Sequence, residues 1–507
     1  MTRIEGRRRQ AGRSSGGVPQ RPFGQIDRRT PWLCVISDDQ VEAIHHAALD
    51  VLAQQGMRVL HPPARDLFAK AGARVEGDTV RLDPGLVEER LKTIPDSFTL
   101  AARNPAKSLR IGGAVCVYAS VGGPAYVMCN DKGRRDGTFA EMCDFLRLVQ
   151  GLNVIHQEGG GPFEPLDLPA STRHLDIYHA QIRHLDKSWQ TQTLGHARTM
   201  DGIEMAAIML GVAPEGLRDR PVLLGIINTN SPLQLDIPMA EGLIALAEYG
   251  QVNVITPFTL AGAMAPVTLA GALVLQHAEA MAGIVLTQIV RPGVPVMYGG
   301  FTSNVDMRSG SPAFGTPEYA KAAQASGQLA RHIGVPFRSS NVTAANAVDA
   351  QAAYESQMAL WGALTGGAHL LEHAAGWLHG GLTASFEKLI LDAEMLQMMD
   401  AWSEPLATTV ADLALDAIRE AGAGGHFFGT AHTMERYEHA FHAPMLSNWD
   451  NYPTWLHRGG IDAAARANRV WKELLAQAED PPLDPGIDEA LSAYVARRKV
   501  EGGAPMN

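Results

Sequence analysis

The sequence predicts an α/β protein built on a TIM (β/α)8 barrel, with an N-terminal α+β cap and a helical C-terminal extension. After Thr138, short apolar strands alternate with helical segments of ten to twenty residues. Seven such units follow one another, and an eighth strand is expected nearby. No Gly-x-Gly-x-x-Gly motif stands at a strand-to-helix turn, which argues against a dinucleotide-binding sheet.

The predicted strands are short apolar runs. They read NVIHQEG (153–159), KSWQTQT (187–193), PVLLGIINT (221–229), VNVITPFTL (252–260), VPVMYGG (294–300), VPFRSSN (335–341) and AHLLEH (368–373). Helices are expected at 196–211, 238–250, 269–290, 316–334 and 349–367. The fourth has Thr316 as N-cap, Pro317 as its first residue and Gly334 after its end. Alternation of this kind implies parallel pairing through right-handed crossovers, and an open doubly wound sheet is the alternative.

Composition shifts along the chain divide it into four parts. Residues 1–30 hold eight arginines and no apolar run, so they predict a disordered basic tail. Residues 31–137 form the α+β cap, whose first helix begins after Ser37 and ends at Gly56. Residues 138–400 form the barrel. Residues 401–507 are helical and rich in aromatics, and we expect them to pack across the barrel or on a partner subunit, which makes a homo-oligomer the expected assembly.

Charge and cysteine content exclude several classes of protein. The formal charge of −11 argues against a nucleic-acid or membrane-surface binder. The four cysteines lack Cys-x-x-Cys spacing, so we expect neither disulfides nor a cysteine-rich zinc site. We expect a cytoplasmic location. The apolar run 252–290 is interrupted by Pro257, Pro266, His277 and Glu279, and therefore predicts a buried strand, a loop and a buried helix rather than a membrane span.

The carboxyl ends of the predicted strands carry a polar, mostly neutral set of residues with several aromatics. They are Gln157, Glu158, Gln190, Gln192, Asn228, Asn230, Phe258, Tyr298, Gly299, Gly300, Phe301, Asn341, Glu372 and His373. In a TIM barrel, catalysis takes place at these ends. No Gly-x-Ser-x-Gly motif is present, and no metal site is predicted, because His369 and His373 belong to an apolar strand that favours structural histidines.

Aromatic side chains near a few acids suit a quaternary ammonium ligand, because its diffuse charge is held by ring faces at about 0.5–2 kcal/mol per contact. Tyr298 and Phe301, which flank Gly299 and Gly300, are the better candidates. Tyr354, Met358 and Trp361 form a helical stripe, which is more typical of a core. The wider set of candidates is Trp189, Phe258, Tyr298, Phe301, Tyr354, Trp361 and Trp377.

Several segments resemble one known family in the same order, from about residue 38 to 470. They are LLGIINTNSPLQLD, LAGAMAPVTLAGALVLQHAEAMAG, RPGVPVMYGG, GTPEYAKAA, DAQAAYESQ and GGLTASFEKLILDAEML. These resemble the trimethylamine methyltransferase family of corrinoid-dependent methyltransferases. The resemblance implies a TIM barrel and methyl transfer from an amine to the Co(I) form of a corrinoid (cobalamin) carried by a separate small protein.

Some members of that family carry pyrrolysine in the loop before the segment DAQAAYES. Here this loop reads Ala344, Ala345, Asn346, Ala347 and Val348, so no pyrrolysine is expected. The chain is similar to the pyrrolysine-lacking branch, for which quaternary amines such as glycine betaine are the implied substrates. Such an amine needs no general acid, because its leaving group is a neutral tertiary amine.

These arguments assign roles to individual residues. We expect catalytic roles for Glu158, Tyr298 and Glu355, and substrate contacts from Gln192, Phe258, Phe301, Tyr354 and His373. Asn230, Gly299, Gly300 and Asn346 are expected to face the corrinoid, since small residues there would leave it room. A substrate carboxylate would be bound by His156, His373 or Arg338. The chain lacks the Asp-x-His-x-x-Gly motif that ligates cobalt, so the corrinoid is expected on a partner protein or free.

Two other functions stay open from the sequence. The barrel could be a non-catalytic protein that binds or senses betaine-like solutes through its aromatic residues. It could also be a different TIM-barrel enzyme, a lyase or a hydrolase, which a divalent metal at His369 and His373 would favour.

Overall fold

The computed structural model describes residues 17–505 and shows a closed parallel barrel. Six strands follow one another around it in the order β6-β17-β16-β13-β11-β9. They span Val117–Ser120, Leu370–Ala375, Phe337–Ser340, Val296–Gly299, Val252–Ile255 and Leu224–Ile227. Two extended segments complete the circle, because Gln157 bridges both Ala119 of β6 and Ser188, while Gln190 bridges Leu224 of β9. The predicted TIM barrel is confirmed.

The first strand of the barrel comes from the part of the chain that the sequence assigned to the cap. Strand β6 ends at Ser120, whereas the barrel was expected to begin at residue 138. The reason is spatial, because β6 is followed by a hairpin and not by a helix, so the strand–helix alternation starts only after it. The hairpin strands β7 and β8 span Tyr126–Cys129 and Gly133–Asp136.

Eight helices surround the barrel. They are α4 (Phe139–Gly151), α5 (Arg173–His184), α6 (His196–Leu210), α7 (Ile237–Glu248), α8 (Leu269–Val290), α9 (Pro317–His332), α10 (Ala350–Gly366) and α11 (Phe386–Ser403). Helix α8 is long and apolar enough to cross a membrane, but 72% of its most apolar window is buried against the rest of the chain. It packs on α1, α3, α7 and α9, so it is a core helix of the barrel, as predicted.

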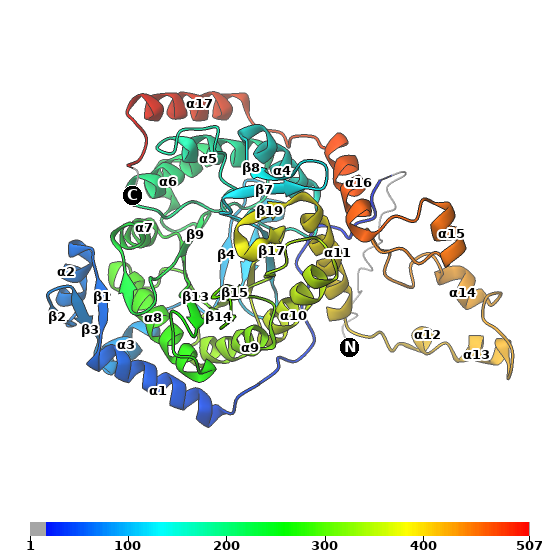
Figure 1. Cartoon of the computed structure of the whole chain (residues 1–507), viewed down its shortest axis with the longest axis horizontal. Helices are drawn as coiled ribbons and strands as arrows, with labels where there is room; N and C mark the ends of the chain where they lie inside the picture. Colours follow the sequence, from blue (N-terminus) through cyan, green and yellow to red (C-terminus); the bar gives the residue numbers. More distant parts are fainter. Residues whose placement is uncertain (1–16, 506–507) are drawn as a thin grey trace, which may run out of the picture.

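The N-terminal unit lies against the side of the barrel, not over its mouth (Figure 1). It comprises α1 (Asp38–Gln54), β1 (Met57–Val59), α2 (Pro62–Lys70), β2 (Arg74–Glu76), β3 (Thr79–Arg81) and α3 (Pro84–Leu91). Ser37 caps α1 as expected, in a capping box with Gln40. Strand β10 (Gln234–Leu235) pairs in parallel with β1 and ties the unit to the barrel.

A hairpin closes the end of the barrel where its strands begin, which we call the bottom. Its strands are β4 (Phe98–Leu100) and β5 (Leu109–Ile111), with a short 3-10 helix η1 (Pro105–Lys107) between them. Leu100, Leu109 and Ile111 are fully buried against the first residues of the barrel strands. The bottom is therefore sealed by apolar packing.

Residues 17–30 are ordered, although the sequence predicted a disordered tail over 1–30. Arg28 is buried, and its guanidinium donates to the carbonyl oxygens of Leu364 (3.0 Å) and Ala368 (2.8 Å). The buried pairing explains the order of this segment, because a buried guanidinium is costly unless it is hydrogen-bonded, and Leu364 and Ala368 supply acceptors. The prediction for residues 1–16 lies outside the described residues.

Short strands extend the barrel at its other end, which we call the mouth. Strands β12 (Phe258–Ala261), β14 (Phe301–Val305) and β15 (Pro312–Ala313) form one small sheet. Strands β18 (Trp377–Leu378) and β19 (Thr383–Ser385) form another sheet with β7 and β8. The 3-10 helix η3 (His379–Gly381) connects β18 to β19. These additions place the residues that follow β11, β13 and β17 over the barrel opening.

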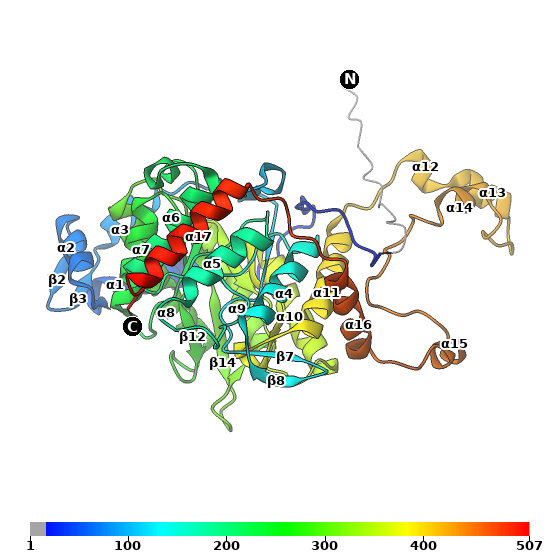
Figure 2. The same ribbon diagram turned by 90° about the horizontal axis from the view of Figure 1, so that it is seen from above.

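The C-terminal region has two parts (Figures 1 and 2). Helix α16 (Ala463–Ala476) packs on α4 and α11, and α17 (Pro485–Val500) crosses α5 and α6. Between α11 and α16, residues 404–462 project away from the barrel as an arm. The arm carries only short helices: α12 (Val410–Leu413), α13 (Leu415–Ala421), α14 (Ala431–Arg436) and α15 (Tyr452–His457).

Candidate active site

Two buried carboxylates mark the inner wall of the mouth. Glu158 follows the second barrel strand, and Glu372 lies in β17; both are fully buried. Glu158 accepts hydrogen bonds from the backbone N–H groups of Gly160 (2.9 Å) and Gly161 (2.7 Å), and from the Gln181 amide of α5. Gln190 donates to Glu372 Oε2 at 2.7 Å. One of the amides predicted at the strand ends, Gln190, therefore orients Glu372, while Glu158 is oriented by backbone N–H groups and by Gln181 of α5.

Both acids have raised pKa values. Burial raises the pKa of Glu158 to about 7, and the hydrogen bonds from the N–H groups of Gly160 and Gly161 oppose this rise. Burial also raises the pKa of Glu372 to about 7, opposed mainly by the positive charge of Arg338 and further raised by Glu158. Both carboxyls therefore hold a proton more readily than an exposed glutamate does.

Arg338 of β16 is the cation of this wall, and it is 2% exposed. Its Nε and Nη1 atoms are buried and have no hydrogen-bond partner among residues 17–505. Glu372, whose charge acts on Arg338, also has a buried oxygen, Oε1, without a hydrogen-bond partner in the described chain. Since buried polar groups are nearly always paired, the unpaired atoms of Arg338 and Glu372 mark a candidate ligand-binding site, which we call the chamber.

A cluster of four aromatic residues, the aromatic cluster, covers this chamber: Phe258, Phe301, Phe314 and Trp377. Its ring centroids lie 5.2 to 6.4 Å apart. Phe258 and Phe301 are cross-strand partners in β12 and β14. Phe301, Phe314 and Trp377 are 5, 2 and 8% exposed and Phe258 is half-buried, so the cluster is closed except at Phe258.

The cluster and the chamber are in direct contact. The guanidinium carbon of Arg338 lies 5.3 Å from the centroid of the Phe301 ring. The His373 ring stands 4.5 Å from Trp377, and its Nδ1 accepts from the Gly122 N–H at 3.3 Å. Burial lowers the pKa of His373 well below its usual value, so the ring is neutral. His373 also has a φ of 55°, a strained conformation typical of functional sites.

Glu355 supports the loop that leads from β16 to α10. Its Oε2 accepts from Thr343 Oγ1 (2.5 Å) and from the N–H groups of Ala344 (2.9 Å) and Ala345 (3.2 Å). The loop in turn accepts backbone hydrogen bonds from His379 and Gly380, which follow the Trp377 strand. Glu355 therefore fixes the backbone beside the aromatic cluster. Asn346, in the same loop, is exposed, and its carbonyl accepts from His379 Nε2.

The structure does not bring several predicted residues to the mouth. Tyr298 points outward to α8, where its hydroxyl accepts from Gln276 at 3.0 Å. A Cβ on Gly299 would lie 2.1 Å from Thr256 Oγ1, and one on Gly300 would lie 2.8 Å from Ser326 Cβ. Glycine is required at these two positions because the end of β13 packs closely on its neighbours. Neither glycine serves to leave space at the opening.

Two further candidates also lie apart from the chamber. Asn230 is exposed and exchanges hydrogen bonds with Asp236, the N-cap of α7, so it shapes that loop. Tyr354 is 62% exposed on α10, and with Met358 and Trp361 it forms an outward stripe, not the core that the helical spacing suggested. Spacing alone identifies a face of a helix but not what covers it. Gln192 is half-buried, and its N–H donates to the Tyr178 hydroxyl of α5.

Sequence reasoning missed part of the site. Phe314 follows a surface hairpin and has no motif around it. Arg338 was considered only as one of three carboxylate ligands, since nothing in the sequence shows that its guanidinium is unpaired. His156, another of the three, is used elsewhere: Nδ1 accepts from Tyr118 N–H and Nε2 lies 3.3 Å from the Gly24 carbonyl.

No metal centre is evident within residues 17–505, since no group of three or more His, Cys, Asp or Glu side chains is arranged to hold an ion. His369 and His373 do not form a pair. His369 accepts from the Phe337 N–H at 2.9 Å, and its other nitrogen lies 3.1 Å from the Gly113 carbonyl. Both nitrogens of His369 are therefore used within the fold.

Comparison with known proteins defines the family. The model of the trimethylamine methyltransferase (MTTB) family matches residues 3–503. The chain belongs to the trimethylamine methyltransferase family. It is 37% identical to the glycine betaine methyltransferase of Desulfitobacterium hafniense (strain Y51), over 92% of this chain and 98% of that protein. It is 27% identical to the trimethylamine methyltransferase MttB2 of Methanosarcina mazei, over 91% of this chain and 94% of that protein.

A solved structure supports the same fold. The crystal structure of the monomethylamine methyltransferase of Methanosarcina barkeri matches with a TM-score of 0.51 at 8% identity, covering 95% of this chain and 91% of that one. At this identity the likeness concerns the fold alone. Together the family match and the relatives confirm the methyltransferase class that the sequence predicted.

Proposed function

We propose that this chain transfers a methyl group from a quaternary amine bearing a carboxylate, of the glycine betaine type, to the Co(I) form of a corrinoid carried by a separate protein. The observation that carries the proposal is an unpaired buried guanidinium, Arg338, directly beneath the aromatic cluster. A quaternary ammonium has no N–H to donate, so ring faces are its natural site. A carboxylate at the other end of the ligand would satisfy the free donors of Arg338.

The reaction needs little acid–base chemistry. The carbon–nitrogen bond breaks, its electron pair remains on nitrogen as a neutral tertiary amine, and Co(I) supplies both electrons of the new cobalt–carbon bond. No proton moves, so Glu158 and Glu372 need not act as general acid or base. We assign them the role of holding the strand-end amides and balancing the charge of Arg338.

The same chemistry explains why the nitrogen is held by rings and not by an adjacent anion. The positive charge on nitrogen declines toward the transition state, so a strong anionic partner would stabilise the substrate more than the transition state and slow the reaction. Aromatic faces bind the cation more weakly, while Arg338 anchors the unreactive end. Acceleration then comes mainly from aligning one methyl group with cobalt.

Binding and transfer are tested separately. Glycine betaine, choline and trimethylamine are titrated against the full chain, following tryptophan fluorescence, and the betaine is expected to bind most tightly. Each amine is then incubated with Co(I) cobalamin, and the visible spectrum is followed for methylcobalamin. Glycine betaine should give methylcobalamin and dimethylglycine. Binding without any methylation would instead support a sensing protein, and no binding of any quaternary amine would exclude the proposal.

Two variants connect the result to the site. Trp377→Leu removes one ring of the cluster and should weaken betaine binding by about tenfold, the equivalent of one cation–π contact of 1–2 kcal/mol. Tyr354→Leu is the matched control, because this exposed ring on α10 belongs to neither the cluster nor the chamber. Equal losses in both variants would contradict the assignment of the cluster as the ammonium site.

A further inference from the structure

The arm, residues 404–462, exposes an unusual amount of apolar surface. Between residues 404 and 444 only Ala417 and Thr430 are buried. Phe428, Phe441 and Trp449 are 85, 86 and 72% exposed. The other large apolar side chains exposed on the arm are Leu406, Val410, Leu413, Leu415, Ile418, Phe427, Met434, Tyr437, Tyr452 and Leu456. The arm has no core of its own in this structure.

The helices of the arm are too short to be stable in isolation. Helices α12, α13 and α14 have 4, 7 and 6 residues. Isolated helices of fewer than about 12–15 residues are marginal in water. Each exposed aromatic offers ~150–250 Å² of surface, so the arm presents on the order of 1,000 Å² of apolar area. That exceeds the few hundred Å² usual on a monomer and matches one stable protein–protein interface.

The arm is fixed to the barrel at its base. The Glu394 carboxylate of α11 accepts from the N–H groups of Met445 (2.8 Å) and Ser447 (3.2 Å). Arg466 donates to the carbonyl oxygens of Leu446 (3.0 Å) and Ile461 (2.8 Å). These contacts hold the arm in its projecting direction (Figure 2), and Glu404 adds an ion pair with Arg21 where the arm leaves α11. The contacts at its base therefore hold the arm outward from the barrel.

A second apolar surface lies on the barrel next to the arm. It consists of Tyr354, Met358 and Trp361 on α10 and Met398 and Trp402 on α11, which we call the α10–α11 patch. All five are exposed by 38 to 62%, and the rings of Trp361 and Trp402 are in contact at 4.6 Å. Trp402 lies in the last turn of α11, directly before the arm begins. Tyrosine, tryptophan and methionine are the residues enriched at protein interfaces.

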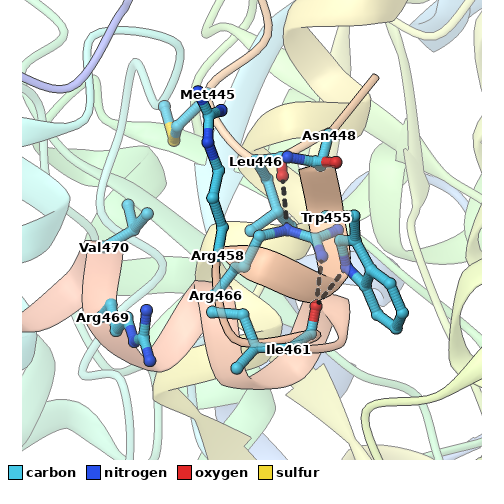
Figure 3. A pocket seen from close by; sticks show the side chains of 9 residues that line it. All are labelled: Met445, Leu446, Asn448, Trp455, Arg458, Ile461, Arg466, Arg469 and Val470. Carbon is cyan, nitrogen blue, oxygen red and sulfur yellow. Dashed lines mark hydrogen bonds between the residues drawn. The ribbon is translucent and has the colours of Figure 1, made fainter. Parts of the chain in front are cut away.

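Charge complements this apolar match. Residues 404–444 carry Glu404, Asp412, Asp416, Glu420, Glu435 and Glu438 against Arg419 and Arg436 only. At the base of the arm, a surface pocket of about 260 Å³ is lined in part by the apolar side chains of Met445, Leu446 and Val470 (Figure 3). Arg458, Arg466 and Arg469 line the same pocket; Asp450 already pairs with Arg458 at 2.9 Å, so the positive charge there comes from Arg466 and Arg469. An acidic apolar segment therefore has an apolar, arginine-lined acceptor on the same side of the molecule.

We propose that two copies of this chain exchange arms, so that residues 404–444 of each copy cover the α10–α11 patch and the arginine-lined pocket of the other. Because each copy carries both donor and acceptor, one twofold axis satisfies both surfaces, and the contact is closed. The acidic character of the arm argues against an anionic lipid surface as the occupant.

The first experiment measures mass in solution. Light scattering of the full chain after size exclusion should give a multiple of the single-chain mass. The double variant Phe428→Ser, Phe441→Ser should shift the population toward monomer, and so should Met358→Glu, which sets a carboxylate against the acidic arm. Val500→Ser, at a 91% exposed position on α17, is the matched control and should leave the mass unchanged. A monomeric parent chain, with or without binding to lipid vesicles, would overturn the proposal.

The second experiment identifies the contact itself. In a background in which the exposed Cys34 is replaced by serine, Phe428→Cys and Met358→Cys chains are mixed and treated with a short bis-maleimide. A cross-linked species of twice the chain mass should form in the mixture far more than with Val500→Cys in place of Met358→Cys. If instead a single chain carrying both cysteines forms an internal cross-link and no dimer, the arm folds back on its own chain and the exchange is wrong.

Discussion

The two ends of the barrel differ in how their polar groups are satisfied. At the bottom, Lys187 is almost fully buried, yet its Nζ donates to the carbonyl oxygens of Val149, Leu152 and Ile155 at 2.7 to 2.8 Å. At the mouth, Arg338 is equally buried, and two of its nitrogens have no partner in the described chain. The two side chains are equally buried, but the protein supplies hydrogen-bond partners for Lys187 and leaves part of Arg338 without them.

This difference separates stability from function. A buried charge with all its hydrogen bonds made stabilises one conformation, whereas a buried charge without partners costs free energy until a ligand supplies them. The apolar hairpin of β4 and β5 reinforces the bottom, and the aromatic cluster only covers the mouth. We therefore expect substitutions at the bottom to affect unfolding, and substitutions at the mouth to affect binding.

The largest effect is expected from Lys187→Met. It removes the Nζ donor from the buried carbonyl groups of Val149 and Ile155, whereas that of Leu152 keeps the Ile155 N–H. At about 1–3 kcal/mol for each unsatisfied group, unfolding should be easier by roughly 2 kcal/mol or more. Denaturant unfolding of the full chain measures this. At a temperature where the variant is folded, its affinity for glycine betaine should equal that of the parent. A large loss of affinity in the folded variant would contradict the assignment of stability to the bottom and of binding to the mouth.

Arg338→Met is the corresponding change at the mouth. Loss of the carboxylate anchor should weaken glycine betaine binding by roughly 100-fold, in line with the 2–5 kcal/mol typical of a truncated buried charge pair. Choline, which has no carboxylate, should bind the variant and the parent alike. Thermal unfolding should change little or move upward, because an unpaired buried charge is removed. A marked fall in the melting temperature would mean that Arg338 is structural.

Stability should also depend on pH through the mouth. The folded-state pKa values of Glu158 and Glu372 are raised from 4.5 to about 7, so between these values the folded chain binds more protons than the unfolded chain. Their stabilising contribution is therefore present below about pH 4.5 and is lost as the pH rises through 7. Melting temperatures measured from pH 5 to 8 should fall with pH, and Glu372→Gln should make the slope shallower. An unchanged slope in this variant would contradict the shifted pKa.

The smallest effect is expected from Glu355→Ala. Without this carboxylate, Thr343 Oγ1 and the Ala344 N–H lose their acceptor, Ala345 keeps only Thr343 Oγ1, and the loop that supports the Trp377 strand loosens. Betaine affinity should fall several-fold, less than in Trp377→Leu, because every ring is still present. Glu355→Gln keeps an acceptor oxygen and should recover part of the loss. No recovery would argue for a direct catalytic role of the charge.

Part of the site followed from the sequence because it depends on chain position. The strand-end rule placed Glu158, Phe258, Phe301, Glu372 and His373 at one end of the barrel, and the structure brings these five to the chamber and its cover. The same rule included Tyr298, which lies on the outward side of its strand. Alternation along β13 decides that direction, and a run of apolar and glycine residues does not reveal its phase.

The sequence by itself determined the barrel, its helices and the family, because periodicity, capping residues and segment order are local properties of the chain. Only the tertiary structure decided which buried charged groups have all their hydrogen bonds made. In the sequence, Lys187 and Arg338 are both basic residues in apolar strands, and the carbonyl groups that surround Lys187 come from other segments. The tertiary structure also decided that Tyr354, Met358 and Trp361 face outward beside the arm, since the covering of a helical face depends on packing between segments far apart in the chain.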